Sequence, residues 1–116
     1  MAKKLPPELL SRVAARFRAL SDEARLRLLL RLRQGPATVS ELVEATGLSQ
    51  PSVSKHLGVL REVGIVASRR EGTQVLNDIR DQTVFNLCDI VCNGVRTYHA
   101  EINKALRTRS AINFEI

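Results

Sequence analysis

The stretch Thr38–Gly64, TVSELVEATGLSQPSVSKHLGVLREVG, carries the strongest structural signal in the chain. Thr38 and Glu41 have the spacing of a capping box, which predicts that a helix begins there. Gly47 suits the left-handed residue that ends a helix, and Ser49 is a typical N-cap for a second one. Two helices joined by a turn of three or four residues that contains glycine form a helix-turn-helix. This stretch therefore predicts that motif.

The second of these helices is expected to be the recognition helix. Its apolar residues recur at helical spacing, which leaves the opposite face to short polar and basic side chains. Glutamine can read adenine with two hydrogen bonds, serine bonds to bases or phosphates, and lysine contacts phosphates or guanine. The expected DNA contacts on this helix are Ser49, Gln50, Ser52, Ser54, Lys55, His56 and Arg61. A solvated face of an ordinary helix is the competing interpretation, and His56 fits either one equally well.

Length and charge are compatible with a small DNA-binding protein. The chain has 116 residues, for which we expect a single domain spanning residues 1–116. Its net charge of +6 favours a polyanionic partner. Residues 1–34 contain nine Lys and Arg against three Asp and Glu, so the basic excess precedes the helix-turn-helix. A solvated helical face explains part of this excess, and phosphate contacts beside the recognition helix are the alternative.

The sequence lacks the signals of a membrane or secreted protein. No apolar run approaches the roughly 20 residues that a membrane-spanning helix needs. The N-terminal segment MAKKLPPELL has neither the apolar core nor the cleavage site of a signal peptide. The two cysteines, four residues apart, predict thiols in a reducing compartment rather than a disulfide framework. We therefore expect a cytoplasmic protein with no membrane partner.

Two helices are predicted within residues 6–34, ahead of the helix-turn-helix. A proline pair can begin the first helix, whose apolar stripe ends near Leu20. Ser21 is expected to cap the second helix, with Asp22 and Glu23 in its first turn. The stripe of the first helix consists of Leu9, Leu10, Val13, Phe17 and Leu20. The second helix is expected to bury Ala24, Leu28, Leu29 and Leu32 and to expose Arg25, Arg27, Arg31 and Arg33.

The pattern of residues 65–79 predicts a β-hairpin. Two β-compatible runs, Ile65–Arg70 and Gln74–Ile79, are separated by the three residues Glu71-Gly72-Thr73. A hairpin directly after a helix-turn-helix is a wing, and basic residues near its tip would hold phosphates or probe the minor groove. The expected DNA contacts on the wing are Arg69, Arg70, Thr73 and Gln74. For the arginine pair, a solubilising edge of a two-stranded ribbon is the alternative.

A long helix is predicted over residues 82–107. Its apolar positions alternate spacings of four and three, which gives a seam with a period of 3.5 residues. That seam consists of Val84, Cys88, Val91, Val95, Tyr98, Ile102 and Ala105. A domain this small has no internal partner for such a seam, so we expect a homodimer that also involves the first helix. Symmetry would then place two recognition helices one DNA turn apart on a palindromic operator. The final residues, SAINFEI, carry no interpretable motif and either fray or fold back.

Together, these elements predict a mostly α-helical winged helix-turn-helix in the order α-α-α-α-β-β-α. The segments ALSDEARLRLLLRL and TVSELVEATGLSQPSVSKHLGVLREVGIVASRREGTQV resemble the ArsR/SmtB-type family of winged helix-turn-helix repressors. The resemblance extends from about Leu9 to Leu106. It implies a homodimer, formed by the first and last helices, that occupies an operator and represses transcription of its own operon. It also implies release from DNA by a metal, a metalloid or thiol oxidation.

The sensor sites of that family are matched only in part. The helix before the recognition helix, SELVEATG, has no thiol where arsenic- or cadmium-sensing members place paired cysteines. On the last helix, Asn86-x-Cys88 and His99-x-x-Ile102 occupy the spacing of the zinc-type site. Asn86 is a poor ligand there and Ile102 cannot be one. The widely spaced cysteines of persulfide-sensing members are absent as well, so the resemblance leaves the inducer open.

Cys88, Cys92 and His99 are the candidate sensor residues. The two thiols lie on one helix face and could hold a soft metal ion, and His99 returns to nearly the same face. A closed site of four ligands would have to be shared across the dimer. Thiol oxidation is a second alternative, and small buried hydrophobic residues, which we favour, are a third. No cofactor is firmly predicted, and a transition metal or metalloid ligand remains an open alternative.

Enzymatic activity is not expected. A cysteine and a histidine are the minimum for a nucleophile and its base, but no glycine-rich loop, nucleophile elbow or paired-carboxylate site accompanies them. The main alternative to a DNA-binding repressor is a winged-helix dimer that acts through protein contacts alone. Such a protein would show no salt-sensitive binding to any duplex. A DNA-binding regulator without metal or redox sensing is a further alternative.

Overall fold

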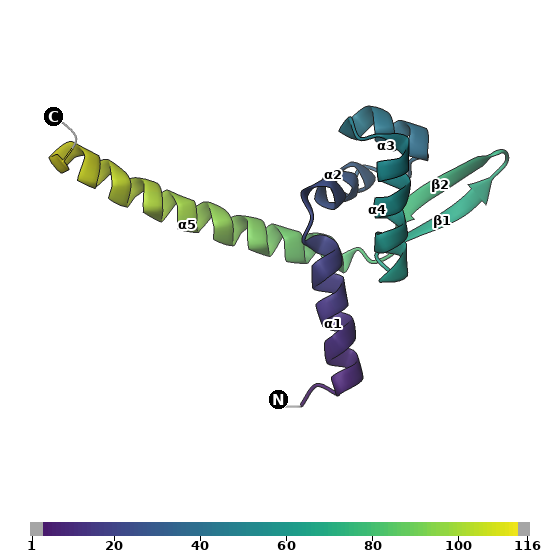
Figure 1. Cartoon of the computed structure of the whole chain (residues 1–116), viewed down its shortest axis with the longest axis horizontal. Coiled ribbons are helices and arrows are strands. Elements are labelled where there is room, and N and C mark those ends of the chain that lie inside the picture. The colour runs from purple at the N-terminus through teal and green to yellow at the C-terminus, as the bar shows by residue number, and fades with distance from the viewer. Residues whose placement is uncertain (1–3, 114–116) are drawn as a thin grey trace. The chain divides into compact units, whose positions relative to one another are not determined.

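The structure is a computed structural model that describes residues 4–113, with side chains through residue 107. These residues form five helices and a two-stranded sheet in the predicted order (Figure 1). The elements are α1 (Pro7–Leu20), α2 (Glu23–Leu32), α3 (Val39–Thr46), α4 (Gln50–Glu62), β1 (Val66–Glu71), β2 (Gln74–Ile79) and α5 (Thr83–Asn113). They divide into two compact units, residues 1–82 and 83–116. The expected winged helix-turn-helix is confirmed.

The core of the first unit lies between α2, α3, α4 and the start of β1. Apolar side chains from these four elements, and from Ile65 just before β1, pack together and are almost completely shielded from solvent. They are Leu28, Leu29, Leu32, Leu42, Val53, Leu57, Leu60, Ile65 and Val66. The expected burial of Leu28, Leu29 and Leu32 in α2 is confirmed, whereas Ala24 remains partly exposed. Because α4 contributes three of these side chains, the core fixes one face of this helix and leaves the other to solvent.

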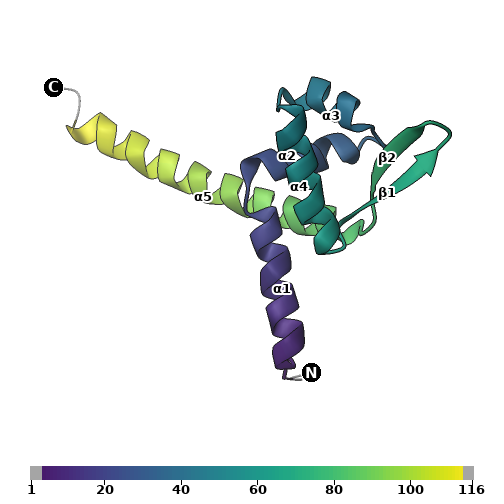
Figure 2. The same cartoon turned by 45° about the vertical axis from the view of Figure 1, so that its right-hand side comes forward.

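The caps predicted at the helix-turn-helix are present. The Thr38 hydroxyl accepts the N–H of Glu41 at 3.1 Å, and the Glu41 carboxylate accepts the N–H of Thr38 at 2.9 Å, which completes the capping box. Gly47 ends α3 in the left-handed conformation, with φ 75°. The Ser49 hydroxyl then accepts the N–H of Ser52 at 3.2 Å and begins α4. As Figures 1 and 2 show, α3 consequently lies across the N-terminal end of α4.

The cap of α2 differs from the prediction. Asp22, and not Ser21, is the N-cap, because its carboxylate accepts the N–H of Arg25 at 3.1 Å. Ser21 instead ends α1 through a bond from its N–H to the carbonyl of Arg18. Both residue types cap helices well, so the choice depended on where α1 ended.

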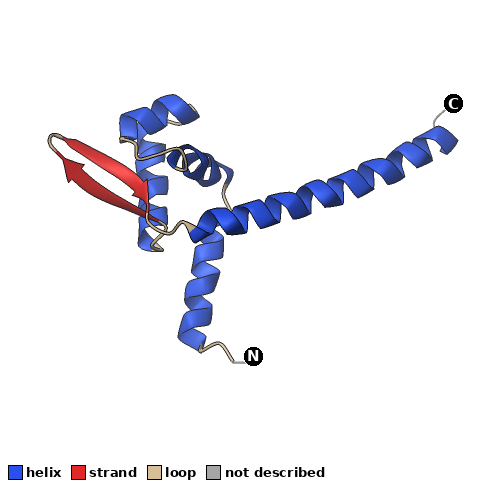
Figure 3. Ribbon diagram, turned by 180° about the vertical axis from the view of Figure 1, so that it is seen from behind, coloured by secondary structure: helices blue, strands red, loops and turns tan. Residues whose placement is uncertain are grey.

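The wing turn is shorter than predicted. Antiparallel pairing runs from Val66–Ile79 to Glu71–Gln74, so Glu71 belongs to β1 and the turn contains only Gly72 and Thr73. Gly72 has φ 63°, and no described non-glycine residue has a positive φ. A type II′ turn prefers glycine at its first central position and a residue with negative φ at its second. The twist of this turn matches that of the strands. Figure 3 shows the resulting narrow hairpin in red.

The second unit is the helix α5, which is longer than the predicted 82–107. It begins at Thr83 and continues to Asn113, since no proline or glycine after Gly94 interrupts it. Residues 110–113 of the tail are therefore helical, and residues 114–116 lie outside the described part of the chain. No helix among the described residues combines the length and apolarity needed to cross a bilayer.

Candidate DNA-binding surface

The polar face of α4 is accessible where DNA contacts are expected. Gln50, Ser54 and Lys55 are exposed in the first two turns, and none of them bonds to another described side chain. Ser52 is half-buried, and the hydroxyl of Ser49 is occupied as the N-cap. A capping hydroxyl still has a proton to donate. The structure therefore leaves Gln50, Ser54 and Lys55 on the solvent-facing side of this helix.

His56 is held by Arg25, a residue that was expected from the sequence to face solvent. Nη1 of Arg25 lies 3.2 Å from Nδ1 of His56. The same guanidinium donates to the carbonyl of Ala19 at 2.6 Å and to that of Arg18 at 3.3 Å. Only 15% of the Arg25 side chain is exposed. The expectation that Arg25 faces solvent is wrong, because its long side chain crosses the junction of α1, α2 and α4.

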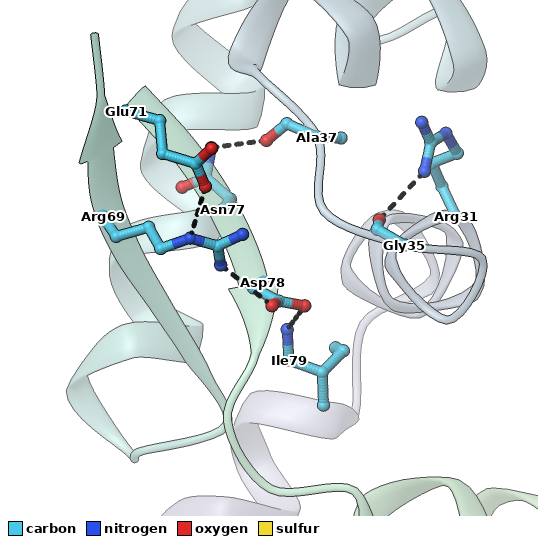
Figure 4. Close-up of polar contacts among 8 residues, drawn as sticks. All are labelled: Arg31, Gly35, Ala37, Arg69, Glu71, Asn77, Asp78 and Ile79. Atoms are coloured by element: carbon cyan, nitrogen blue, oxygen red, sulfur yellow. Dashed lines mark hydrogen bonds and ion pairs between the residues drawn. The ribbon is translucent and has the colours of Figure 1, made fainter. Parts of the chain in front are cut away.

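Arg61 takes part in a hydrogen-bond chain that fixes the wing. Its guanidinium donates to the hydroxyl of Ser68 at 3.2 Å, and that hydroxyl donates to Oδ1 of Asn77 at 2.8 Å. Asn77, 1% exposed, completes the chain through Nδ2, which donates to the carbonyl of Ala37 at 3.2 Å. Figure 4 shows this side-chain bond, and two backbone bonds of 2.8 and 3.0 Å also join Ala37 to Asn77. The chain links α4, both strands and the segment before α3.

Asn77 is a structural residue that was not predicted from the sequence. A signal was present, since Val75, Asn77 and Ile79 occupy one face of β2 at a period of two residues. A polar residue at an inward position among apolar ones requires internal partners, because an unpaired buried amide is costly. Asn77 thus marks the point where the wing meets the helical core.

The two wing arginines are not equivalent. Arg69 donates to the carboxylates of Glu71 at 2.9 Å and Asp78 at 3.0 Å (Figure 4). The hydrogen bond to Glu71, followed by that to Asp78, raises the pKa of Arg69 above its ordinary value. Arg70 is exposed, and its side chain makes no hydrogen bond or ion pair with any other residue that the structure describes. Thr73 and Gln74 are also exposed, next to this free guanidinium.

Part of the N-terminal basic excess lines an open cleft between α1 and the C-terminal end of α4. The cleft measures about 960 Å³. Its guanidinium groups belong to Arg12, Arg16, Arg18, Arg25 and Arg80. Arg16 bonds to the carboxylate of Asp81 and, at 2.7 Å, to the carbonyl of Val63. This arginine therefore ties α1 to the C-terminal end of α4.

The candidate sensor residues all lie on α5. Cys88 is half-buried, Cys92 and His99 are exposed, and neither cysteine forms a disulfide within the chain. The ring of His99 meets Tyr98 edge-on, with centroids 5.7 Å apart. The described residues of one chain contain no cluster of three or more side chains able to hold a metal ion. A site with four ligands would need residues from a second copy.

Comparison with known proteins identifies relatives of this fold. Residues 22–68 match the family model described as bacterial regulatory protein, arsR family. The transcriptional regulator NmtR of Mycobacterium tuberculosis is 37% identical over 91 residues, which cover 78% of this chain and 72% of NmtR. The transcriptional repressor SmtB of the same species is 37% identical over 90 residues, 78% of this chain and 64% of SmtB.

A solved structure with the same architecture comes from Mycobacterium bovis. It is a homodimeric winged helix-turn-helix DNA-binding domain with a TM-score of 0.71 and 33% identity. The match covers 83% of this chain and 91% of that domain. Agreement therefore extends beyond the helix-turn-helix to most of the chain.

Proposed function

Starting from the fact that this chain belongs to the ArsR family of bacterial regulatory proteins, we propose that it represses its own operon as a homodimer bound to a palindromic operator. Family membership makes it a winged helix-turn-helix DNA-binding transcriptional regulator. The proposal adds the oligomeric state, the form of the operator and the direction of regulation. It also assigns the protein to the cytoplasm, where the DNA is.

One observation carries the DNA-binding part of the proposal. The first two turns of α4 present Gln50, Ser54 and Lys55 to solvent, while Val53 and Leu57 on the same turns are at most 1% exposed. A helix held rigidly by one face, with hydrogen-bonding side chains on the other, has the properties needed to enter a major groove. The exposed guanidinium of Arg70 on the wing supplies a phosphate contact beside it.

The proposed dimer is supported by apolar surface that the chain leaves uncovered. On α5, Val91, Val95 and Tyr98 are each about half-exposed or more, although they belong to the predicted seam. On α1, Leu10 and Phe17 are both 54% exposed. Contiguous exposed apolar residues at heptad spacing are typical of an interface between copies of a chain.

For the inducer, the proposal keeps the soft-metal and thiol-oxidation alternatives. Cys88 and Cys92 are one turn apart on α5, so two copies together could provide four thiolates for a soft ion. The zinc-type ligand set of the family does not fit, since Asn86 and Ile102 occupy two of its positions. Exposure of Cys92 also makes it open to oxidants.

Fluorescence anisotropy on the operator region tests the proposal. The reduced protein would be titrated onto labelled DNA from upstream of its own gene at several salt concentrations. A protein that neutralises Z phosphates should lose affinity as salt rises, with a slope of about +0.9Z in log Kd against log salt. Zinc, cadmium or arsenite, and finally a mild oxidant, would then be added to the complex.

The outcomes separate the alternatives. Tight, salt-sensitive binding to a palindrome supports the repressor, and release by one addition identifies the class of inducer. Binding that no addition disturbs keeps the DNA-binding function and assigns Cys88, Cys92 and His99 to packing. Failure to bind any duplex refutes the proposal and favours the winged-helix dimer that acts through protein contacts.

A further inference from the structure

We infer that Arg25 fixes His56 as the neutral tautomer with its proton on Nε2, so that the recognition helix presents one oriented N–H donor to an acceptor on DNA. This inference rests on the proposed DNA-binding function. It makes Arg25, a residue of α2, a positioning residue for a contact made from α4.

The chemistry of the pair determines the tautomer. Arginine has five N–H donors and no acceptor, so a hydrogen bond between Arg25 and Nδ1 requires a lone pair on Nδ1. A neutral imidazole with a lone pair on Nδ1 must carry its proton on Nε2. The contact at 3.2 Å therefore identifies which ring nitrogen is the donor.

Nε2 of His56 is accessible to a ligand. No hydrogen bond from Nε2 to another described residue is present. Yet among the described residues that are not exposed, none has a side-chain nitrogen or oxygen atom that is both buried and unpaired. Since His56 is half-buried, Nε2 must reach solvent. Ser52, one turn before His56 on α4, is among the residues that are proposed to meet DNA.

Arg25 is held firmly enough to act as a positioning residue. Nε and Nη2 bond to two carbonyls at the end of α1, and Nη1 lies 3.9 Å from the Asp22 carboxylate that caps α2. The guanidinium is therefore tied to two helices before it reaches His56. Its planar fork makes these bonds simultaneously, which the single ammonium of lysine cannot do.

The DNA acceptor is a phosphate oxygen or the edge of a base. A neutral Nε2–H can donate to either, and the tautomer excludes a role as acceptor toward adenine N6 or cytosine N4. A phosphate acceptor and a base acceptor have different effects on the sequence preference of the protein. Loss of a phosphate contact weakens binding to all duplexes alike, whereas loss of a base contact changes the preferred sequence.

Long-range ¹H–¹⁵N correlation spectra of the reduced protein test the tautomer directly. The chain has two histidines, and His99 on α5 serves as the internal reference. We expect Nδ1 of His56 to resonate as an unprotonated nitrogen and Nε2 as a protonated one at neutral pH. Protonation on Nδ1, or an even mixture of tautomers, would overturn the inference even if DNA binding is normal.

Two histidine variants separate the contacts of the two ring nitrogens. His56→Asn places an amide where Nδ1 lies and keeps the contact with Arg25, but it lacks the distal donor. His56→Gln extends an N–H toward the position of Nε2. We expect His56→Asn to weaken operator binding about tenfold, the loss of one hydrogen bond to a charged acceptor, and His56→Gln to recover most of it.

The role of Arg25 is tested by a double-mutant cycle. Arg25→Lys should weaken DNA binding about fivefold in the wild type but about twofold or less beside His56→Asn, because both changes remove the same contact. Arg27→Lys is the matched control on the same helix, since among the described residues the guanidinium of Arg27 bonds to the Glu23 carboxylate alone. Thermal unfolding confirms that each variant is folded.

The results distinguish this inference from the proposed function. If His56→Asn binds the operator like the wild type while Lys55→Ala binds more weakly, the inference is wrong and the regulator stands. If the effects of Arg25→Lys and His56→Asn simply add, Arg25 does not act through His56. If the wild type binds no duplex, the proposed function fails, and the contact on DNA fails with it.

Discussion

At the scale of single residues, Asn77 is the polar group on which the attachment of the wing depends. Both ends of its amide are satisfied, by the Ser68 hydroxyl and the Ala37 carbonyl, at a site with 1% exposure. Such a group stabilises the native state only while its partners are kept, since each orphaned donor or acceptor loses its solvation.

Asn77→Ala is therefore expected to lower the free energy of unfolding by about 1–3 kcal/mol. Urea denaturation followed by circular dichroism would measure the change. Ser68→Ala removes the donor to Oδ1 of Asn77 and leaves that buried acceptor without its partner, so it should cost a similar amount, about 1–3 kcal/mol. A urea midpoint for Asn77→Ala equal to that of the wild type would contradict this view of the wing.

Two helix-capping carboxylates make the stability of the protein depend on pH in the acid range. The N–H of Arg25 lowers the pKa of Asp22 below its ordinary value of 3.8, and the N–H of Thr38 lowers that of Glu41 below 4.5. A carboxylate whose folded pKa is depressed stabilises the protein above its unfolded pKa, and this contribution is lost as pH falls through the folded pKa.

The melting temperature should consequently fall as pH decreases below 4.5, and part of this fall should be absent in Asp22→Asn with Glu41→Gln. Both amides keep the capping hydrogen bonds but have no proton to gain. Calorimetry of the wild type and of the double variant, from pH 6 downward, provides the measurement. The melting temperatures are compared as changes from each protein's own value at pH 6. If the melting temperatures of both proteins fall equally with pH, other carboxylates account for the whole effect.

At the scale of elements, the turn between α3 and α4 depends on Gly47. Its φ of 75° lies in the left-handed region, and a Cβ there would meet no atom within 4 Å. Strain in the backbone, not a clash, is therefore the expected penalty of a substitution.

Gly47→Ala should cost about 1–2 kcal/mol, the price of a left-handed conformation for an alanine. Gly47→Asn should cost clearly less, because asparagine tolerates that region. Chemical denaturation of both variants would measure the difference. Equal losses would point to a cause other than the backbone conformation.

The wing should contact DNA through Arg70 more than through Arg69. Because Arg69 is already held by Glu71 and Asp78, its charge is balanced within the hairpin. Arg70→Ala should weaken binding to most duplexes and reduce the salt slope by about one. Arg69→Ala is the matched comparison and should leave the salt slope nearly unchanged. A larger change of slope for Arg69→Ala would reverse this assignment.

At the scale of the whole molecule, assembly should decide DNA affinity. Val95, 49% exposed, lies in the middle of the α5 seam that we propose to be a dimer interface. A carboxylate at this position would be buried without a partner in the dimer, which is strongly unfavourable. Two linked recognition helices bind a palindrome much more tightly than one, through their high effective concentration.

Val95→Asp should therefore yield monomers and reduce operator affinity by more than tenfold. Asn93→Asp adds the same charge on the opposite face of α5 and should remain dimeric. Sedimentation equilibrium reports the oligomeric state, and anisotropy reports the affinity. A Val95→Asp protein that stays dimeric would show that this seam is not the interface.

The features that the sequence predicted correctly arise from interactions over a few residues. The capping box of Thr38, the glycine at position 47 and the N-cap Ser49 each need only the next three or four residues to act. The same holds for the β-compatible runs that form β1 and β2 and for the apolar period of the helices. For this reason the order of elements, most of their bounds and the exposed face of α4 followed from local chemistry.

The features that required the folded chain join residues that are far apart in sequence. Arg25 reaches His56 across 31 positions, Asn77 reaches Ala37 across 40, and Arg16 reaches Asp81 across 65. No local pattern encodes such pairs, because long polar side chains that look solvent-facing in a periodic helix can bridge elements once these pack. Tertiary packing thus determined which arginines remain available for DNA and which ones support the fold.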